Sequence, residues 1–401
     1  MQNLVDWLVI VLRWAHIVAI LGWVGASLYF MWLDSKLRQP APARDSVLGE
    51  AWMGHGGGFY IVEKRHISPG AVPSPVWWFR NEAMITWVTG FLLLVFVYYW
   101  SGGSDLVEAQ GSVLSPGAAI VFAIGLLAVC WFVYDLLWAS RFAADRWVAA
   151  TVVSSVLLAG VVLLLCKLFT GRAAYIHIGA VMGTCMVGNV WTRIIPSQVE
   201  AVAATSAGRE RNMVMALRAR RRAQHNTYLT LPVIFTMIAA HAPATYSHHL
   251  NALIMVLLIA AGAAARYMMI LWDRRTPFAQ GWVAPVVAVG AAVIVIPWLT
   301  ASHEAMASPQ ADGKAVSFNV ARGILELRCA SCHAAAPTDK AFTGPPGGVR
   351  MDTPQDIAKH ASRVQATSIT TRAMPPGNVT GMTTEERELV ARWLAAGARA
   401  Q

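Results

Sequence analysis

The sequence predicts an all-α protein, in which a polytopic bundle of eight transmembrane helices precedes a small extramembrane domain. Three observations predict this class. Apolar residues make up 56% of the 401 residues and charged residues only 13%, a composition that is rare in soluble proteins. Eight apolar stretches are long enough to cross a bilayer, which takes about 20 residues. Beyond the last of them, residues 329–333 carry two cysteines and a histidine at fixed spacing.

The apolar stretches define a membrane domain over residues 1–300. In order they are approximately 7–32, 82–100, 115–139, 148–170, 174–195, 227–242, 248–271 and 282–300. The first follows Asp6 and has no early cleavage site, so we interpret it as a retained span rather than a signal peptide. The sixth is short and contains Pro232. Residues 33–81 form the main loop outside the membrane, and residues 301–315 form a linker.

The C-terminal segment, residues 316–401, contains Cys329-Ala330-Ser331-Cys332-His333. This is C-x-x-C-H, the attachment sequence of a c-type haem. The two thiols can form thioethers to the haem vinyl groups, and His333 is placed to ligate the iron. The alternatives are a chance C-x-x-C, a redox dithiol or half of a zinc site. Zinc would need a second ligand pair, and this segment has no other cysteine.

Met374 is the predicted second axial ligand, because cytochromes c commonly use a methionine there. It lies in the proline-bounded stretch Met374-Pro375-Pro376-Gly377, and Met382 and Met351 are the alternatives. We also expect a helix over 320–328 that enters the attachment site, and a last helix over 385–396 capped by Thr383 or Thr384. Residues 316–401 therefore resemble a small class I cytochrome c domain.

The charge distribution predicts the orientation in the membrane. Bacterial c-type haem is attached outside the cytoplasmic membrane, so the resemblance implies a periplasmic C-terminus. An even number of spans then places the N-terminus in the periplasm too, and the loops after spans 1, 3, 5 and 7 should be basic. The loop after span 5 carries Arg218 and Arg220–Arg222, whereas 101–114 and 243–247 have no Lys or Arg. The net charge of +10 thus reflects insertion into the bacterial inner membrane and its lipid bilayer, not a nucleic-acid partner.

Histidines toward the outer side of the bundle suggest a second cofactor. Ionisable side chains inside a membrane are costly and often functional, and neutral imidazoles on facing helices can ligate a haem b. The candidates for this role are His16, His177, His241 and His248. A single membrane histidine is more often a hydrogen-bonded packing residue, and this alternative stays open.

Polar residues at the inner side predict a substrate pocket. Glu82 follows Asn81 at the start of span 2, Asn189 lies near the end of span 5, and His225 and Asn226 precede span 6. A glycine-rich stretch, 54–65, lies in the loop on the same side, and its glycines permit close approach to a ligand. Helix capping, interfacial anchoring and a flexible loop are the alternatives.

Several of these segments resemble the membrane-bound urate oxidases (urate hydroxylases) of bacteria, as does the order of eight spans and a cytochrome c domain. The matching stretches are His177-Ile178-Gly179-Ala180, Asn189-Val190, Ile194-Ile195-Pro196, Gly58-Phe59-Tyr60-Ile61-Val62-Glu63-Lys64, and His225-Asn226-Thr227-Tyr228-Leu229-Thr230-Leu231-Pro232 with His241 downstream. One departure is Ile61, where the family loop is expected to carry Arg.

The resemblance implies oxidation of urate to 5-hydroxyisourate, with water supplying the hydroxyl group. It also implies a covalent haem c, a possible haem b, and electron transfer to soluble cytochrome c or a terminal oxidase. We expect urate at the inner face near Asn226, held by an Arg or a backbone N–H. His225 is the first candidate for the general base and Glu82 the second. A periplasmic pocket beside His241 is the competing geometry.

Two other functions remain open at this stage. The chain could be a haem relay that passes electrons from quinol to a periplasmic acceptor. The first span, with Arg13-Trp14-Ala15-His16-Ile17, also looks like small haem-linked membrane proteins of the protoporphyrinogen-oxidase type.

Overall fold

The computed structural model describes residues 2–68, 72, 75–108, 112–307, 316–339, 342, 344–370 and 374–399. Seven of the described helices are long and apolar enough to cross a membrane. They comprise α1 (Gln2–Lys36), α2 (Arg80–Leu94) with η1 (Val95–Tyr99), α3 (Pro116–Ala139), α5 (Trp147–Leu168), α6 (Gly171–Asn189) with η2 (Val190–Ile194) and α7 (Ile195–Ser206), α10 (Asn251–Asp273) and α11 (Val283–Ala307). By their length and composition these helices indicate a membrane protein, as the sequence predicts.

The predicted sixth span is the second half of α8 (Met213–Ile238), which continues into η3 (Ala239–His241). The first half of α8 carries four arginines, so its apolar stretch is too short to stand among the seven apolar helices. Instead α8 packs between α6 and α10. Gly179 on α6 makes room for Thr236, and Gly262 on α10 makes room for the Pro232 ring. An eighth crossing by α8 therefore stays a prediction.

Two other sequence-based boundaries differ from the structure. The fifth span does not end near residue 195, because α6, η2 and α7 form one continuous helix of 36 residues. Its polar residue Asn189 therefore lies within a helix rather than at its end. The predicted linker begins later as well, since α11 continues to Ala307; residues 308–315 lie outside the described residues.

The all-α prediction is wrong for the loop 33–81, which contains a β-hairpin. Strands β1 (Val47–His55) and β2 (Gly58–Arg65) pair antiparallel, with His55 opposite Gly58. Gly56 and Gly57 form the turn at φ values of 59° and 78°, a left-handed conformation that only glycine adopts at little cost. The glycine-rich stretch is therefore explained by a hairpin turn.

The C-terminal domain is helical and has its own core. It contains α12 (Phe318–His333), α13 (Pro354–Lys359), α14 (Ala361–Val364) and α15 (Thr384–Ala395). Phe318 on α12 packs against Trp393 on α15, with ring centroids 5.8 Å apart. Thr383 caps α15 through a reciprocal capping box with Glu386, which confirms the predicted cap.

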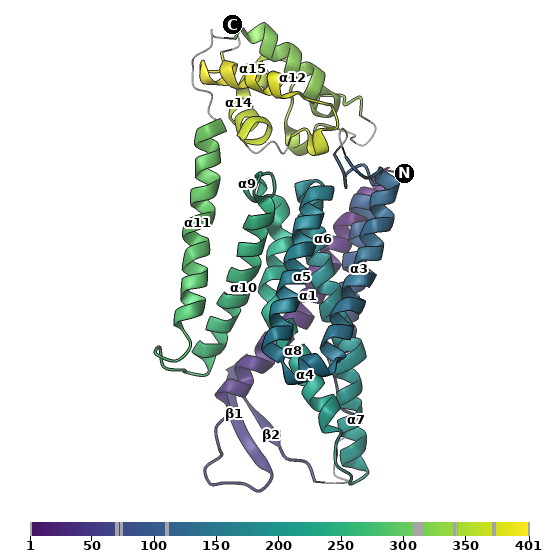
Figure 1. The fold of residues 1–401 in the computed structure, drawn as a ribbon, viewed down its shortest axis with the longest axis vertical. Helices are drawn as coiled ribbons and strands as arrows, with labels where there is room; N and C mark the ends of the chain where they lie inside the picture. Colours follow the sequence, from purple (N-terminus) through teal and green to yellow (C-terminus); the bar gives the residue numbers. More distant parts are fainter. Residues whose placement is uncertain are drawn as a thin grey trace.

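The two ends of the bundle differ in what they carry (Figure 1). The C-terminal domain lies over the end that holds the N-terminus and the short helix α9 (Pro243–Tyr246). The β-hairpin projects from the opposite end, which also holds α7 and the short helix α4 (Arg141–Asp145). We call these the terminal end and the hairpin end.

Candidate functional site

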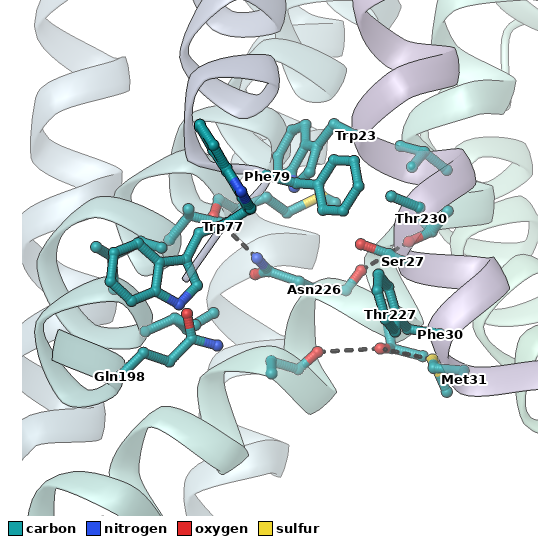
Figure 2. Close-up of a pocket in the computed structure, with 18 residues that line it drawn as sticks. Trp23, Ser27, Phe30, Met31, Trp77, Phe79, Gln198, Asn226, Thr227 and Thr230 are labelled. Atoms are coloured by element: carbon teal, nitrogen blue, oxygen red, sulfur yellow. Dashed lines mark hydrogen bonds between the residues drawn. The ribbon is translucent and has the colours of Figure 1, made fainter. Parts of the chain in front are cut away.

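A cavity of about 450 Å³ is drawn in Figure 2. Its lining residues in the second half of α1 and in α7 place it toward the hairpin end of the bundle (Figure 1). Its walls come from the second half of α1, the segment 77–79 before α2, the continuous helix α6–η2–α7, and α8. This volume suits a small planar ligand. Asn226, near which the sequence predicts a substrate pocket, lines this cavity, whereas the hairpin residues 54–65 do not.

The cavity lining combines aromatic rings with uncharged polar groups. The aromatic members are Trp23, Phe30, Trp77, Trp78 and Phe79, and the polar members are Ser27, Gln198, Asn226, Thr227 and Thr230. None of the lining residues that the structure describes has a titratable acidic, basic or imidazole side chain. Such a wall can stack on a planar ring and hydrogen-bond to its edge, but it cannot by itself neutralise a charge.

Asn226 presents its amide to the cavity in a fixed orientation. Its Nδ2 donates to the Met186 carbonyl at 2.9 Å, and its Oδ1 accepts from Asn189 Nδ2 at 2.8 Å. Because a backbone carbonyl can only accept, the amide nitrogen must face Met186. One N–H and one acceptor lone pair remain, and this pair matches the donor–acceptor edge of a purine.

The side chain of His225 points away from that of its neighbour Asn226, toward α3. Its Nδ1 lies 2.8 Å from the Tyr134 hydroxyl on α3, and its ring packs 4.2 Å from the Trp138 ring. Successive helical residues point about 100° apart, so His225 does not line the cavity. Asn189 Nδ2 also donates to the Tyr134 hydroxyl, at 2.9 Å. Two of the three residues predicted as catalytic, His225 and Asn226, are thus connected through Tyr134 and Asn189.

An ion-pair cluster fixes the helices around this network. Asp135 on α3 accepts from Arg222 Nη2 at 2.8 Å and from Arg193 Nε at 3.0 Å. Arg222 is almost fully buried, at 2% exposed, and it stacks over the Tyr134 ring. The in-span carboxylate therefore has a structural role, which holds α3 against α8 and η2.

Glu82, the second candidate base, lies in the first turn of α2. Its Oε2 atom is buried and has no hydrogen-bond partner among the described residues. The side chain lies beside Gly22 on α1, the residue before Trp23 of the cavity wall. Glu82 is therefore close to the cavity in sequence and structure, although it does not line it.

The four candidate haem b histidines are placed by different elements. His16 Nδ1 lies 2.9 Å from the Thr89 hydroxyl on α2. His177 is buried, and its two ring nitrogens bond to the Tyr99 hydroxyl at 2.9 Å and to the Ala173 carbonyl at 2.7 Å. His248 is also buried and stacks on His249, whereas His241 is exposed at the end of η3. Ligation of a haem b by any of them stays a prediction.

The C-x-x-C-H residues lie at the C-terminal end of α12. His333 Nδ1 donates to the Val349 carbonyl at 3.0 Å, which leaves the Nε2 lone pair for a metal ion, as expected for a ligating histidine. Burial raises the pKa of the Cys329 thiol to about 11, so this thiol is neutral at physiological pH. The donor set of two thiols and one oriented imidazole fits a covalently attached haem.

Met374 differs from the other two candidate methionines in its burial. Met351 and Met382 are buried in the core of the C-terminal domain, at 4% and 2% exposed, while Met374 is half-buried. Its backbone is held on both sides, because its N–H donates to Thr367 and its carbonyl accepts from Arg387, each at 2.9 Å. The backbone of Met374 is therefore fixed, while its side chain does not belong to the buried core of the C-terminal domain.

The fold and the site define a polytopic helical membrane protein with an aromatic, amide-bearing cavity at one end and a separate helical domain at the other. The family model described as urate oxidase N-terminal matches residues 2–300, and the chain belongs to this family. The comparisons with curated proteins and with solved structures found no match. The C-terminal domain lies beyond the matched residues.

Proposed function

We propose that this protein oxidises urate to 5-hydroxyisourate in the bacterial inner membrane and delivers the electrons through a covalent haem c to soluble cytochrome c or a terminal oxidase. The cavity beside Asn226 is the observation that carries the proposal, together with membership of the urate oxidase N-terminal family. The C-x-x-C-H sequence and the orientation of His333 support the haem.

The cavity suits a planar purine. Stacking of a base on an aromatic side chain contributes about 1–3 kcal/mol, and Trp23, Phe30, Trp77 and Phe79 surround the Asn226 amide in Figure 2. The free N–H and oxygen of that amide can pair with adjacent N–H and C=O groups of the urate ring. Gln198 supplies a second amide from α7.

The reaction releases electrons and protons together. Urate and water give 5-hydroxyisourate, two electrons and two protons, and a haem accepts the electrons one at a time. His225 is the first candidate to take a proton and Glu82 the second. Neither lines the cavity, so the proton has to pass an intervening group. Asn189 Nδ2 donates both to Asn226 and to the Tyr134 hydroxyl, so this chain of contacts orients Tyr134 beside His225 but does not itself carry a proton. The Tyr134 hydroxyl, 2.8 Å from His225 Nδ1, is the group that can pass a proton to His225.

A haem b between the two ends would complete the electron path. The cavity lies toward the hairpin end and the C-terminal domain over the terminal end, and about 30 Å of hydrocarbon separates the two faces of a bilayer. His16, His177, His241 and His248 are the proposed ligands. His177 would have to give up its bond to Tyr99. Pyridine haemochrome spectra should show b-type and c-type bands, and a c-type band alone would remove this part of the proposal.

The proposed orientation places the terminal end in the periplasm and the hairpin end in the cytoplasm. Both chain termini are then periplasmic, and urate enters from the cytoplasm, where purines are degraded. Electrons that leave the cavity for a periplasmic acceptor move charge across the membrane.

The experiment is urate consumption by membranes that contain the full chain, with oxygen uptake recorded in parallel. We expect urate-dependent oxygen uptake without peroxide, and its loss in Cys332→Ser. Cys130→Ser, which removes a thiol within α3, is the matched control and should keep the activity. Haem reduction by quinol but not by urate would instead support the relay function.

A further inference from the structure

Arg266 on α10 is a buried cation that forms no direct ion pair among the described residues, although Asp273 on the same helix acts on it at longer range. Its side chain is only 1% exposed, and its Nη2 donates to the Met31 sulfur at 2.9 Å. Its Nε is buried without a partner, and no carboxylate in the described part of the chain forms an ion pair with it. A thioether is a weak acceptor, so the cost of burying this charge is largely uncompensated.

Arg266 lies directly behind the wall of the cavity. Met31, its only hydrogen-bonding partner among the described residues, is one of the lining residues. Figure 2 shows Met31 beside Thr227 at the edge of the cavity, where the Thr227 hydroxyl lies 3.5 Å from the same sulfur. One flexible side chain therefore separates the guanidinium from the cavity.

The other buried arginine of this region shows what a structural charge looks like here. Arg222 is equally buried, yet its Nη2 pairs with the Asp135 carboxylate at 2.8 Å. Arg266 has no such carboxylate, and the cavity lining supplies none. No described carboxylate contacts the guanidinium, and the cavity is the adjacent space in which a ligand could supply that contact.

We propose that Arg266 is the counter-charge for a planar organic anion bound in this cavity. Met31 turns aside, and the guanidinium donates to a ligand oxygen while the aromatic wall stacks on the ring and Asn226 pairs with its edge. The identification of this anion as urate rests on the proposed function. Arg266 would then take the role expected of an Arg at position 61, where Ile61 lies on β2 outside the cavity lining.

The test compares Arg266→Met with Arg274→Met in the full-length, detergent-solubilised, oxidised protein. Both variants lose one positive charge from α10 or its C-terminal cap, but Arg274 is exposed and does not line the cavity. Equilibrium dialysis measures the affinities for labelled urate and for hypoxanthine, a neutral purine of similar shape. Thermal unfolding of each free variant is recorded in the same detergent.

Arg266→Met should weaken urate binding by about 10- to 100-fold, the value of a charge-assisted hydrogen bond, and change hypoxanthine binding by less than about threefold. Its melting temperature should equal or exceed that of the wild type, because an apolar side chain removes an unpaired buried charge. Arg274→Met should bind urate like the wild type.

Two results would overturn the inference. One is unchanged urate affinity in Arg266→Met; the other is a marked loss of thermal stability, which would make Arg266 a structural residue. The outcome is separable from the proposed function. Urate that binds through Arg266 but reduces no haem leaves the anion site standing, whereas normal haem reduction with unchanged affinity in Arg266→Met removes only the anion site.

Discussion

At the scale of single residues, Asn226 is the group at which the cavity meets the buried polar network. Its orientation depends on the Met186 carbonyl and on Asn189, so the amide is set before a ligand arrives. A buried polar group that is left without its ligand partner costs more binding free energy than an average hydrogen bond contributes. Discrimination between purines should therefore depend strongly on this side chain.

Asn226→Leu is expected to raise the KM for urate by about 10- to 100-fold, since the pairing groups are lost while the volume is kept. Thr230→Val is the matched control: it lines the same cavity, but its hydroxyl already donates to the Asn226 carbonyl within α8. Steady-state kinetics of urate oxidation measures the KM of both variants. Equal KM values would exclude a recognition role for Asn226.

His225→Gln should abolish haem reduction by urate and leave the haem spectra unchanged, if His225 accepts a proton through Tyr134. Loss of a general base typically costs about 10²- to 10⁴-fold in rate. Stopped-flow absorbance of the haem bands measures the rate. Loss of a b-type band in the static spectrum would show that His225 is a haem ligand and that its assigned role is wrong.

Met374→Ala should lower the reduction potential of the haem c while the haem stays covalently attached, because a methionine axial ligand raises the potential. Met382→Leu is the control, since Met382 belongs to the buried core and a volume-conserving exchange there is tolerated. Spectroelectrochemical titration of the two variants distinguishes them. An unchanged potential in Met374→Ala would point to another ligand.

A site can be predicted from the sequence where particular residue types at a fixed spacing dictate the chemistry. Cys329, Cys332 and His333 could be chosen because thioether attachment requires these groups at these offsets. Arg266 could not be chosen, because its importance comes from the absence of a contacting carboxylate among the described residues, and that is a property of the packing. Trp77 and Phe79 were also missed, although the aromatic run before Asn81 was a visible signal.

At the scale of elements, the β-hairpin depends on its turn and on an ion-pair cluster. Arg44 pairs with both Glu50 and Glu63, and Arg65 pairs with Glu63. A hydropathy search for spans treats the whole loop 33–81 as a connection, so it detects neither the strand pairing nor the turn at Gly56 and Gly57. The available signal was the Gly56-Gly57 pair between two stretches rich in strand-forming residues.

The hairpin should loosen in acid. The hydrogen bond from Arg65 holds the pKa of Glu63 below its ordinary value, and the charge of Arg44 lowers this pKa further. A carboxyl group with a depressed pKa stabilises the fold above its unfolded pKa, about 4.3 for Glu, and loses this contribution as the pH falls through the folded value. Hydrogen exchange of residues 47–65, corrected for intrinsic rates, should show less protection at pH 4 than at pH 7. In the Glu63→Gln control, protection of the hairpin should be the same at pH 4 and pH 7. Equal protection of the wild-type hairpin at both pH values would contradict the prediction.

At the scale of the whole molecule, the positions of the two ends follow from chain connectivity. The N-terminus and the C-terminal domain share the terminal end, and the hairpin lies at the other (Figure 1). The basic first half of α8 explains why a count of apolar helices gives seven where the sequence predicts eight crossings. The loop charges predict the orientation that the proposed function requires.

Protease added to intact spheroplasts should remove the C-terminal domain and leave the hairpin uncut, while inverted vesicles should give the reverse. Epitope tags after residue 399 and in the Gly56–Gly57 turn report the two cuts on immunoblots. Cleavage of both sites from the same side would contradict the proposed topology.

The most direct measurement is anaerobic. Urate is added to the oxidised, detergent-solubilised full chain, and the haem α-bands are recorded together with urate absorbance. We expect rapid reduction of the haem c, with one urate lost for every two electrons gained. Failure of urate to reduce the haem, with rapid reduction by quinol, would contradict the account and leave the chain as an electron relay.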